Sequence, residues 1–211
     1  MDTVDTIAYR DFEIKIYPEE LEDSPRDWDN LGTMTCFHRR YDLGDKTDLS
    51  SDSFGSWKEL HDYLKKEEHA AIILPLYLLD HSGITMRVGH GFGDVDPQGW
   101  DWGQVGFIWV SREKILQEFS KKRLSKELLE KTETILRSEI ETYDQYLGGE
   151  VYGYCINELN DSCWGFYGHN WEENGLLDYA RKAIDCWHED TEKMQAEANE
   201  LEVYDENQVV L

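Results

Sequence analysis

Two strongly apolar runs stand out along the chain, one from Ala70 to Leu79 and the other from Val105 to Val110. Both are rich in β-branched and aromatic residues and are shorter than a typical core helix, so they predict buried β-strands. A polar turn, Asp80-His81-Ser82-Gly83, follows the first run, and a loop rich in glycine and tryptophan, residues 89–103, precedes the second. We therefore expect these two strands to form the centre of a sheet.

Shorter alternating patterns predict further strands around this centre. Phe12, Ile14 and Ile16 alternate with polar residues, which predicts an amphipathic strand at the edge of a sheet, ended by Pro18. Pro75 cannot donate a hydrogen bond to a ladder, so it predicts a bulge or an unpaired side in the first central strand. The remaining expected strands are 33–38, 84–88, 151–157 and 162–167, the last two joined by a turn at Asn160-Asp161.

Capping residues and helical spacing predict four helices. Ser56 and Glu59 fit a capping box, in which a hydroxyl and a carboxylate each accept a hydrogen bond from an amide at the start of the helix. Apolar residues recur at helical spacing between Leu128 and Leu147, and Gly148-Gly149 forms a natural stop. The four helices are expected to follow Ser56, to span 112–119 and 126–147, and to run from about Glu173 into the 190s.

The order of these elements predicts the fold class. Strands come as hairpins rather than alternating with helices, which is typical of an α+β fold with a mostly antiparallel sheet and helices packed on one face. We expect an α+β core domain over residues 1–168. An acidic C-terminal helix and tail, residues 169–211, would pack on this core or extend from it.

Acidic residues dominate the charge of the chain. Its 211 residues include 45 Asp and Glu against 21 Lys and Arg, a formal net charge of −24. A field of this sign repels nucleic acids and anionic membranes and attracts basic surfaces, so neither direct nucleic-acid binding nor membrane binding is expected. The acidity can serve solubility alone, or it can mimic a phosphate backbone and occupy a basic groove on another protein.

The cysteines and the N-terminal segment predict the compartment. None of Cys36, Cys155, Cys163 and Cys186 forms a C-x-x-C pair, so a zinc ribbon is not indicated. The first residues, MDTVDTIAYRD, lack the apolar run of a signal peptide, and no segment has the length of a membrane span. We expect a cytoplasmic protein with free thiols.

Two groups of residues carry the types needed for hydrolysis or cation binding. Asp80, His81 and Ser82 are the residue types of a hydrolytic triad, but sequence neighbours cannot adopt its geometry, which favours a polar turn. His81 could still act as a general base if it faced a pocket. The second group, with Asp94, Asp96 and Asp101 in the glycine-rich loop, could bind a hard cation, although the spacing of an EF-hand is not met. With Trp100 and Trp102 as aromatic anchors, the same loop could instead bind a protein.

Two further clusters leave alternatives open. Glu139, Glu141 and Asp144 lie near the end of a long helix, where they could hold a metal ion for a nuclease, although a solvated helix face is favoured. The basic segment His38-Arg39-Arg40 could pair with acids such as Asp42 and Asp45, or it could hold an anion.

Five segments of the chain carry a resemblance to a known family. They are DNLGTMTCFHRRYDLGD (29–45), LPLYLLDHSGI (74–84), GQVGFIWVS (103–111), SEIETYDQYLGGEVYG (138–153) and DSCWGFYG (161–168). Together they resemble a family of small acidic proteins of uncharacterised function, found in bacteriophages and mobile elements. The resemblance implies an accessory gene that counters host defence. Because the family supplies no activity, it assigns no catalytic residue.

These observations favour a binding protein that inhibits a host defence machine which itself binds nucleic acid, such as a CRISPR effector or a restriction enzyme. Its partner would be a basic protein or ribonucleoprotein in the host cytoplasm, and no cofactor or metal is expected. The candidate partner-binding residues are Asp94, Asp96, Trp100, Asp101, Trp102, Glu189, Asp190, Glu192 and Glu197. Two alternatives remain: a small metal-dependent hydrolase or nuclease, and a structural or regulatory homo-oligomer.

Overall fold

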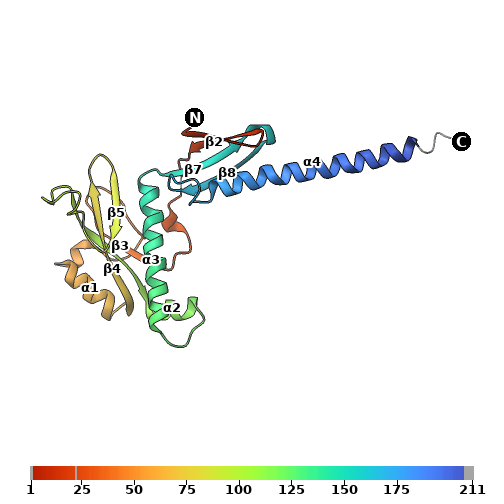
Figure 1. Ribbon diagram of the computed structural model, residues 1–211. Coiled ribbons are helices and arrows are strands. Elements are labelled where there is room, and N and C mark those ends of the chain that lie inside the picture. The colour runs from red at the N-terminus through yellow and green to blue at the C-terminus, as the bar shows by residue number, and fades with distance from the viewer. Residues whose placement is uncertain (1, 22, 207–211) are drawn as a thin grey trace. The chain divides into compact units, whose positions relative to one another are not determined.

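The computed structural model describes residues 2–21 and 23–206, with the backbone alone for residues 200–206 (Figure 1). This part of the chain has four α-helices and two four-stranded antiparallel sheets, which confirms the α+β class. The strands are β1 (Asp5–Tyr9), β2 (Phe12–Pro18), β3 (Thr33–Cys36), β4 (Ala70–Asp80), β5 (Ile84–Val88), β6 (Trp102–Ser111), β7 (Val151–Ile156) and β8 (Asp161–Tyr167). The α-helices are α1 (Trp57–Lys66), α2 (Arg112–Glu118), α3 (Lys126–Leu147) and α4 (Leu176–Glu206).

The chain divides into two compact units. Unit 1 comprises Met1–Glu20 and Glu150–Leu211, and unit 2 comprises Leu21–Gly149. This grouping differs from the expected division at residue 168. The N-terminal hairpin belongs with the C-terminal segments because β2 pairs with β7. Unit 2 is therefore an insertion between two paired strands of unit 1.

The two apolar runs form the centre of the unit 2 sheet, as expected. The strand order is β3-β6-β4-β5, so β4 and β6 are the inner strands and pair with each other along most of their length. The hairpin of β4 and β5 is also confirmed, with Asp80 paired to Ile84. The turn between them places Ser82 and Gly83 at positive φ.

Pro75 is accommodated at the point where the β4–β5 pairing ends. The last paired residues are Leu76 and Val88, and the carbonyl of Pro75 accepts a hydrogen bond from the Gly89 amide at 3.0 Å. The nitrogen of Pro75 lies on the same side of the extended strand as its carbonyl, so it falls just beyond the last paired residues of β5. A shift in the β4–β6 register follows at Leu76/Tyr77, so the expected bulge is present as well.

Helices cover both faces of the unit 2 sheet rather than one. Successive residues of β6 point to opposite faces. Phe107 packs with Leu60 and Leu64 of α1 on one face, whereas Ile108 packs with Leu136 of α3 on the other. Both faces are apolar because β4 and β6 are apolar without alternation, and each face requires its own cover.

The predicted helix signals are found at the expected positions, with one change. The Ser56 hydroxyl accepts a hydrogen bond from the Glu59 amide at 3.3 Å, but the Glu59 carboxylate accepts from the amide of Gly55 at 2.9 Å rather than from that of Ser56. Ser125 caps α3 through the Leu128 amide at 3.2 Å. These caps satisfy amides that have no partner within the helix.

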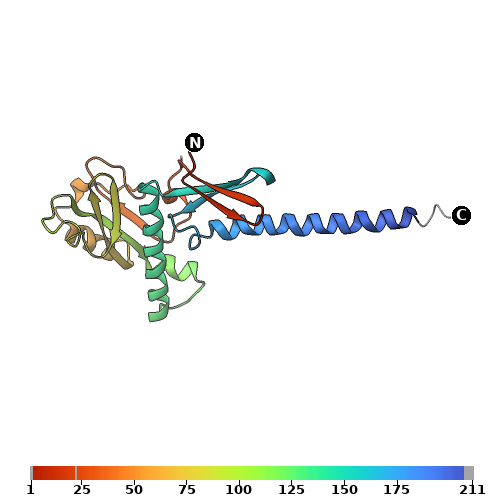
Figure 2. The same ribbon diagram turned by 45° about the horizontal axis from the view of Figure 1, so that its top comes forward.

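Unit 1 is a sheet of order β1-β2-β7-β8 with α4 on one face (Figure 2). The strand with Phe12, Ile14 and Ile16, expected at an edge, is internal: β1 pairs with it on one side and β7 on the other. β1 was not predicted because most of its side chains are exposed, so it lacks a clear apolar pattern. Both views show α4 continuing well past the end of this sheet.

Candidate functional site

The loop between β5 and β6 is organised by Asp96. One carboxylate oxygen accepts hydrogen bonds from the amides of Gln98 and Gly99 at 3.1 and 3.2 Å, and the other accepts from Trp100 and Asp101 at 2.6 and 3.0 Å. These backbone amides, that of Asp101 above all, hold the pKa of Asp96 below its ordinary value. Asp96 therefore serves to hold its own loop, although its side chain remains at the surface.

The other two acids of the loop are also engaged within the chain. Asp94 forms an ion pair with Arg87, whose hydrogen bond to Asp94 holds the pKa of the carboxylate below its usual value. The guanidinium of Arg87 also lies over the ring of Phe92, 3.8 Å from its centroid. Asp101 is hydrogen-bonded to His81 at 2.8 Å. The three loop acids thus have separate partners, and they do not converge on one point.

The two tryptophans of the loop have different roles. The indole N–H of Trp102 donates to the carbonyl of Asp96 at 2.8 Å, and its ring occupies the space that a Cβ on Gly91 would need. Trp102 therefore supports the loop from within. Trp100 is 82% exposed, the most exposed of the large apolar side chains described. Of the two expected anchors, Trp100 is the one free to meet a partner.

The turn after β4 does not form a hydrolytic triad. Asp80 forms an ion pair with Arg40 and accepts a hydrogen bond from the hydroxyl of Tyr41 at 3.1 Å. The side chain of His81 is 69% exposed and faces Asp101. Among the described residues, no serine or cysteine is hydrogen-bonded to His81. The polar turn that the sequence favoured is the structure observed.

The acids near the end of α3 are structural, which corrects the expected solvated face. Glu139 is 11% exposed and forms an ion pair with the buried Arg26 at 3.0 Å. It also accepts from the amides of Leu31 and Gly32, at 2.7 Å and 3.2 Å. Asp144 accepts from the Met86 amide at 2.6 Å, and Glu141 alone is exposed. Within residues 2–21 and 23–199, whose side chains the structure describes, no group of three or more His, Cys, Asp or Glu side chains could hold a metal ion.

No pattern in the sequence marks Arg26 as a buried residue. Its side chain is 3% exposed and also pairs with Asp45, at 2.7 Å and 3.0 Å. Asp45 therefore pairs with Arg26 and not, as expected, with the basic segment His38-Arg39-Arg40. Within that segment, Arg40 pairs with Asp80. An arginine among acids gave no local signal, because its two carboxylate partners come from distant segments.

The acids of α4 lie in a different environment from those of the loop. The first turns of the helix pack on the unit 1 sheet through buried residues such as Leu177 and Ile184. Beyond them, the outer α4 segment (residues 189–199) has every residue exposed except Thr191, which is half-buried. It carries the four predicted acids Glu189, Asp190, Glu192 and Glu197. In the described part of the chain, the one ion pair these acids form is that of Asp190 with Lys193 at 3.5 Å.

An apolar stripe continues from the buried part of α4 into this exposed part. The stripe alternates steps of three and four residues through Leu177, Ala180, Ile184, Trp187, Thr191, Met194 and Ala198. Such spacing keeps residues on one side of a helix and is the spacing of coiled-coil seams. The sheet covers the first three positions and part of Trp187, whose ring centroid lies 5.2 Å from that of Phe12. Trp187 and Met194 are 44% and 63% exposed. The helix therefore presents a partly covered apolar strip with Asp190 and Glu197 along one side.

The negative charge is concentrated in the unit that contains this helix. Unit 1 has 21 acidic and five basic residues, a net charge of −16, and unit 2 has 24 and 16, a net charge of −8. The loop acids belong to unit 2 and the helix acids to unit 1. Among the described residues, no helix has the length and apolar character that crossing a membrane requires.

Comparisons with known proteins add no assignment. A scan against protein-family models found no match for this chain, and searches of curated proteins and of solved structures found none either. The resemblance to a phage-associated family therefore stays a prediction.

Proposed function

We propose that this chain is a binding protein whose outer α4 segment occupies a basic surface of another protein. The observation that carries the proposal is the exposure of four acids, together with Met194 and Ala198 of the apolar stripe, on a helix segment that the sheet of unit 1 leaves uncovered. A helix that is exposed on every side gains little from its own chain, because most helical stability in proteins comes from packing an apolar face. A partner surface would provide that packing.

The charge on this segment selects the chemistry of the partner. None of the four acids lies within the apolar strip. Asp190 and Glu197 are four and three positions from Met194 and so lie along one side of the strip, whereas Glu189 and Glu192 point away from it. A complementary surface would present Lys or Arg beside an apolar contact. Grooves that bind nucleic acid are lined with Lys and Arg, and a helix of acids can occupy such a groove in place of a phosphate backbone.

The biological setting of the proposal rests on the sequence resemblance. An accessory protein of a phage or mobile element would act on a host defence machine of the CRISPR-effector or restriction-enzyme type, in the host cytoplasm. Electrostatic attraction would make capture fast and sensitive to salt. Neither a metal nor a cofactor is required for this activity.

The enzyme alternative is not carried further. The His81–Asp101 pair is its best feature, but in the described residues no nucleophile is hydrogen-bonded to the histidine. The homo-oligomer alternative stays a prediction, and like charges on two copies of the outer α4 segment would oppose their pairing along this strip.

The test is competition between this chain and nucleic acid for a captured partner. The tagged chain is used to capture partners from lysates that express defence systems, and each partner is then purified with its DNA or RNA substrate. The chain should displace the substrate, and higher salt should weaken the complex. A partner that binds the chain and its nucleic acid together would contradict mimicry.

A neutralised variant separates the role of the helix from that of net charge. Glu189→Gln, Asp190→Asn, Glu192→Gln and Glu197→Gln together should weaken binding about tenfold or more, since exposed charge pairs are worth about 0.2–1 kcal/mol each. A matched control removes four exposed acids of unit 2 instead: Asp48→Asn, Asp52→Asn, Glu67→Gln and Glu118→Gln. Equal losses in the two variants would show that bulk charge, and not the outer α4 segment, drives association.

A further inference from the structure

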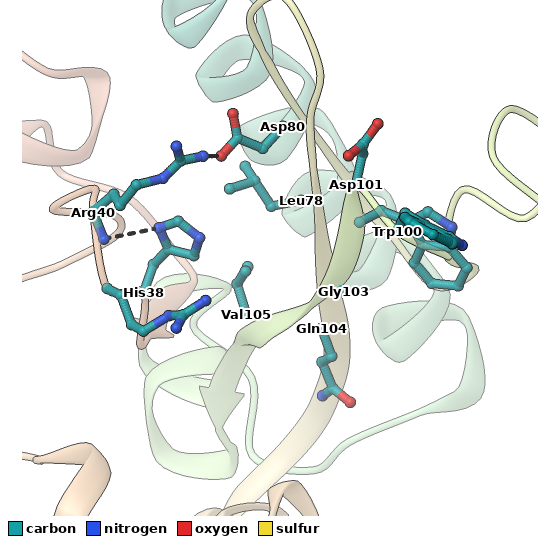
Figure 3. Close-up of a pocket in the computed structure, with 11 residues that line it drawn as sticks. His38, Arg40, Leu78, Asp80, Trp100, Asp101, Gly103, Gln104 and Val105 are labelled. Carbon is teal, nitrogen blue, oxygen red and sulfur yellow. Dashed lines mark hydrogen bonds and ion pairs between the residues drawn. The ribbon is translucent and has the colours of Figure 1, made fainter. Parts of the chain in front are cut away.

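A cavity lies in unit 2 where β3 leaves the sheet. β3 pairs with β6 only as far as Cys36 and Gly106, whereas β6 begins earlier, at Trp102. The chain after β3 turns away, and a cavity of about 610 Å³ opens beside the uncovered end of β6 (Figure 3). This volume falls within the range of small-molecule sites, which is roughly 300–1,000 Å³.

One wall of the cavity is the basic segment His38-Arg39-Arg40. Arg40 is neutralised by its ion pair with Asp80 (Figure 3). Arg39 is exposed and forms no ion pair with any described residue. Arg39 thus places an uncompensated positive charge at the edge of the cavity. Its guanidinium is available to an anion, and it offers the bidentate geometry that suits phosphate or carboxylate.

His38 adds a neutral hydrogen-bond donor to the same wall. Burial and the charges of Arg40 and Arg39 hold the pKa of His38 below its ordinary value, so the ring is neutral at pH 7. Its Nδ1 accepts from the amides of Arg40 and Tyr41, both at 3.3 Å. The neutral ring therefore carries its proton on Nε2. The ring is stacked on Tyr41 with centroids 5.0 Å apart, which fixes its orientation.

The rest of the cavity is suited to a flat apolar group. Leu78 and Val105 form a buried apolar floor, and a Cβ placed on Gly103 would meet no atom within 4 Å. Trp100 stands at the rim and is 82% exposed. The cavity lining contains two acids, Asp80 and Asp101, and Asp101 is hydrogen-bonded to His81. Exposed tryptophan rings are sequence-tolerant platforms on which nucleobases stack.

We propose that this cavity binds a small phosphorylated aromatic molecule of the nucleoside monophosphate class, with the phosphate at Arg39 and the His38 Nε2–H and the ring against Trp100. The net negative charge of the chain would repel the many phosphates of a nucleic-acid polymer. A single phosphate, by contrast, can bind Arg39 without this repulsion along its length. The site lies in unit 2, it uses none of the α4 acids, and it goes beyond the proposed function.

The experiment is calorimetric titration of the full chain with AMP, GMP, CMP and UMP at low salt, with tryptophan fluorescence recorded in parallel. Adenosine and inorganic phosphate serve as the two half-ligands. At least one nucleotide should bind at least tenfold more tightly than either half-ligand and should change the tryptophan emission. If no nucleotide binds more tightly than adenosine and phosphate do separately, the proposal is wrong.

Variants locate the binding in the cavity. Arg39→Gln should weaken nucleotide binding about tenfold or more, the usual cost of losing a charge-assisted phosphate contact. Gly103→Val should also weaken it, because Gly103 lines the cavity, and its thermal unfolding should stay close to that of the parent because the first added carbon meets no atom within 4 Å. Arg123→Gln is the matched control, an exposed arginine of unit 2 outside the cavity. Equal effects of Arg39→Gln and Arg123→Gln, or binding untouched by Gly103→Val, would overturn the assignment.

Discussion

Replacement of Arg26 by methionine is expected to destabilise unit 2 strongly. The guanidinium holds Asp45 through two bonds at 2.7 Å and 3.0 Å, Glu139 at 3.0 Å, and the carbonyl of Gly32 at 2.7 Å. Methionine has a similar length but neither the charge nor the donors. Arg26→Met leaves two carboxylates, 21% and 11% exposed, without the cation that both of them contact.

The expected magnitude follows from this geometry. Removing one partner of a buried ion pair costs about 3–5 kcal/mol, because the remaining charge stays desolvated and uncompensated. The total stability of a domain is typically about 5–15 kcal/mol, so the loss is a large share of it. For a domain the size of unit 2, the midpoint of thermal unfolding should fall by roughly 10–20 °C.

Urea and thermal unfolding, followed by calorimetry and tryptophan fluorescence, measure this effect. The control is Arg137→Met, which removes an exposed arginine of α3 that pairs with Glu133 at 2.7 Å. Exposed pairs of this kind contribute about 0.3–0.5 kcal/mol, so the control should unfold almost as the parent does. Adding Asp45→Asn and Glu139→Gln to Arg26→Met should restore part of the loss. If Arg26→Met cost no more than the control, the network would not be the stabilising feature described above.

Three further predictions concern individual residues. Because the pKa of Asp96 is depressed in the folded state, its contribution to stability is present above the ordinary carboxyl pKa, near 3.9, and is lost as the pH falls below that value. The fluorescence of Trp100 should change over the same acid range, and the Asp96→Asn variant should not show this change. Gly106→Ala should lower the melting temperature measurably, by overpacking worth about 1–3 kcal/mol, because the new methyl group would collide with the Thr35 carbonyl. Burial raises the pKa of Cys36 to about 12, and the residue is half-buried, so a thiol reagent at pH 8 should modify the exposed Cys186 before Cys36; equal rates would contradict this order.

Local signals were sufficient to predict most of the fold. The apolar runs of β4 and β6, the serine caps and the stop at Gly148 act within a few residues of the element they define, so a single sequence reveals them. β1 was missed for the same reason: its exposed side chains give no apolar pattern, and its pairing with β2 alone makes it a strand.

The candidate sites were harder to predict because their partners are distant. Arg26 and Glu139 are 113 positions apart, and no spacing rule connects them. The loop over residues 94–101 is rich in carboxylates, as cation-binding loops are. Only the structure shows that each of its acids has its own partner within the chain. The acids of α4 were placed correctly on a C-terminal helix, because the helical pattern is a local signal.

The insertion of unit 2 between β2 and β7 sets an order for folding during synthesis. β2 pairs with β7 from Lys15–Cys155 to Pro18–Tyr152, so the N-terminal hairpin cannot complete its sheet until residues beyond 150 have left the ribosome. Unit 2 is complete once residue 149 has emerged and can fold first, as N-terminal domains generally do. While unit 2 is being synthesised, the edge of β2 that later pairs with β7 must stay unpaired in solution. The acidic residues around that strand, Asp11, Glu13, Glu19 and Glu20, are suited to keeping such an edge from pairing with other chains.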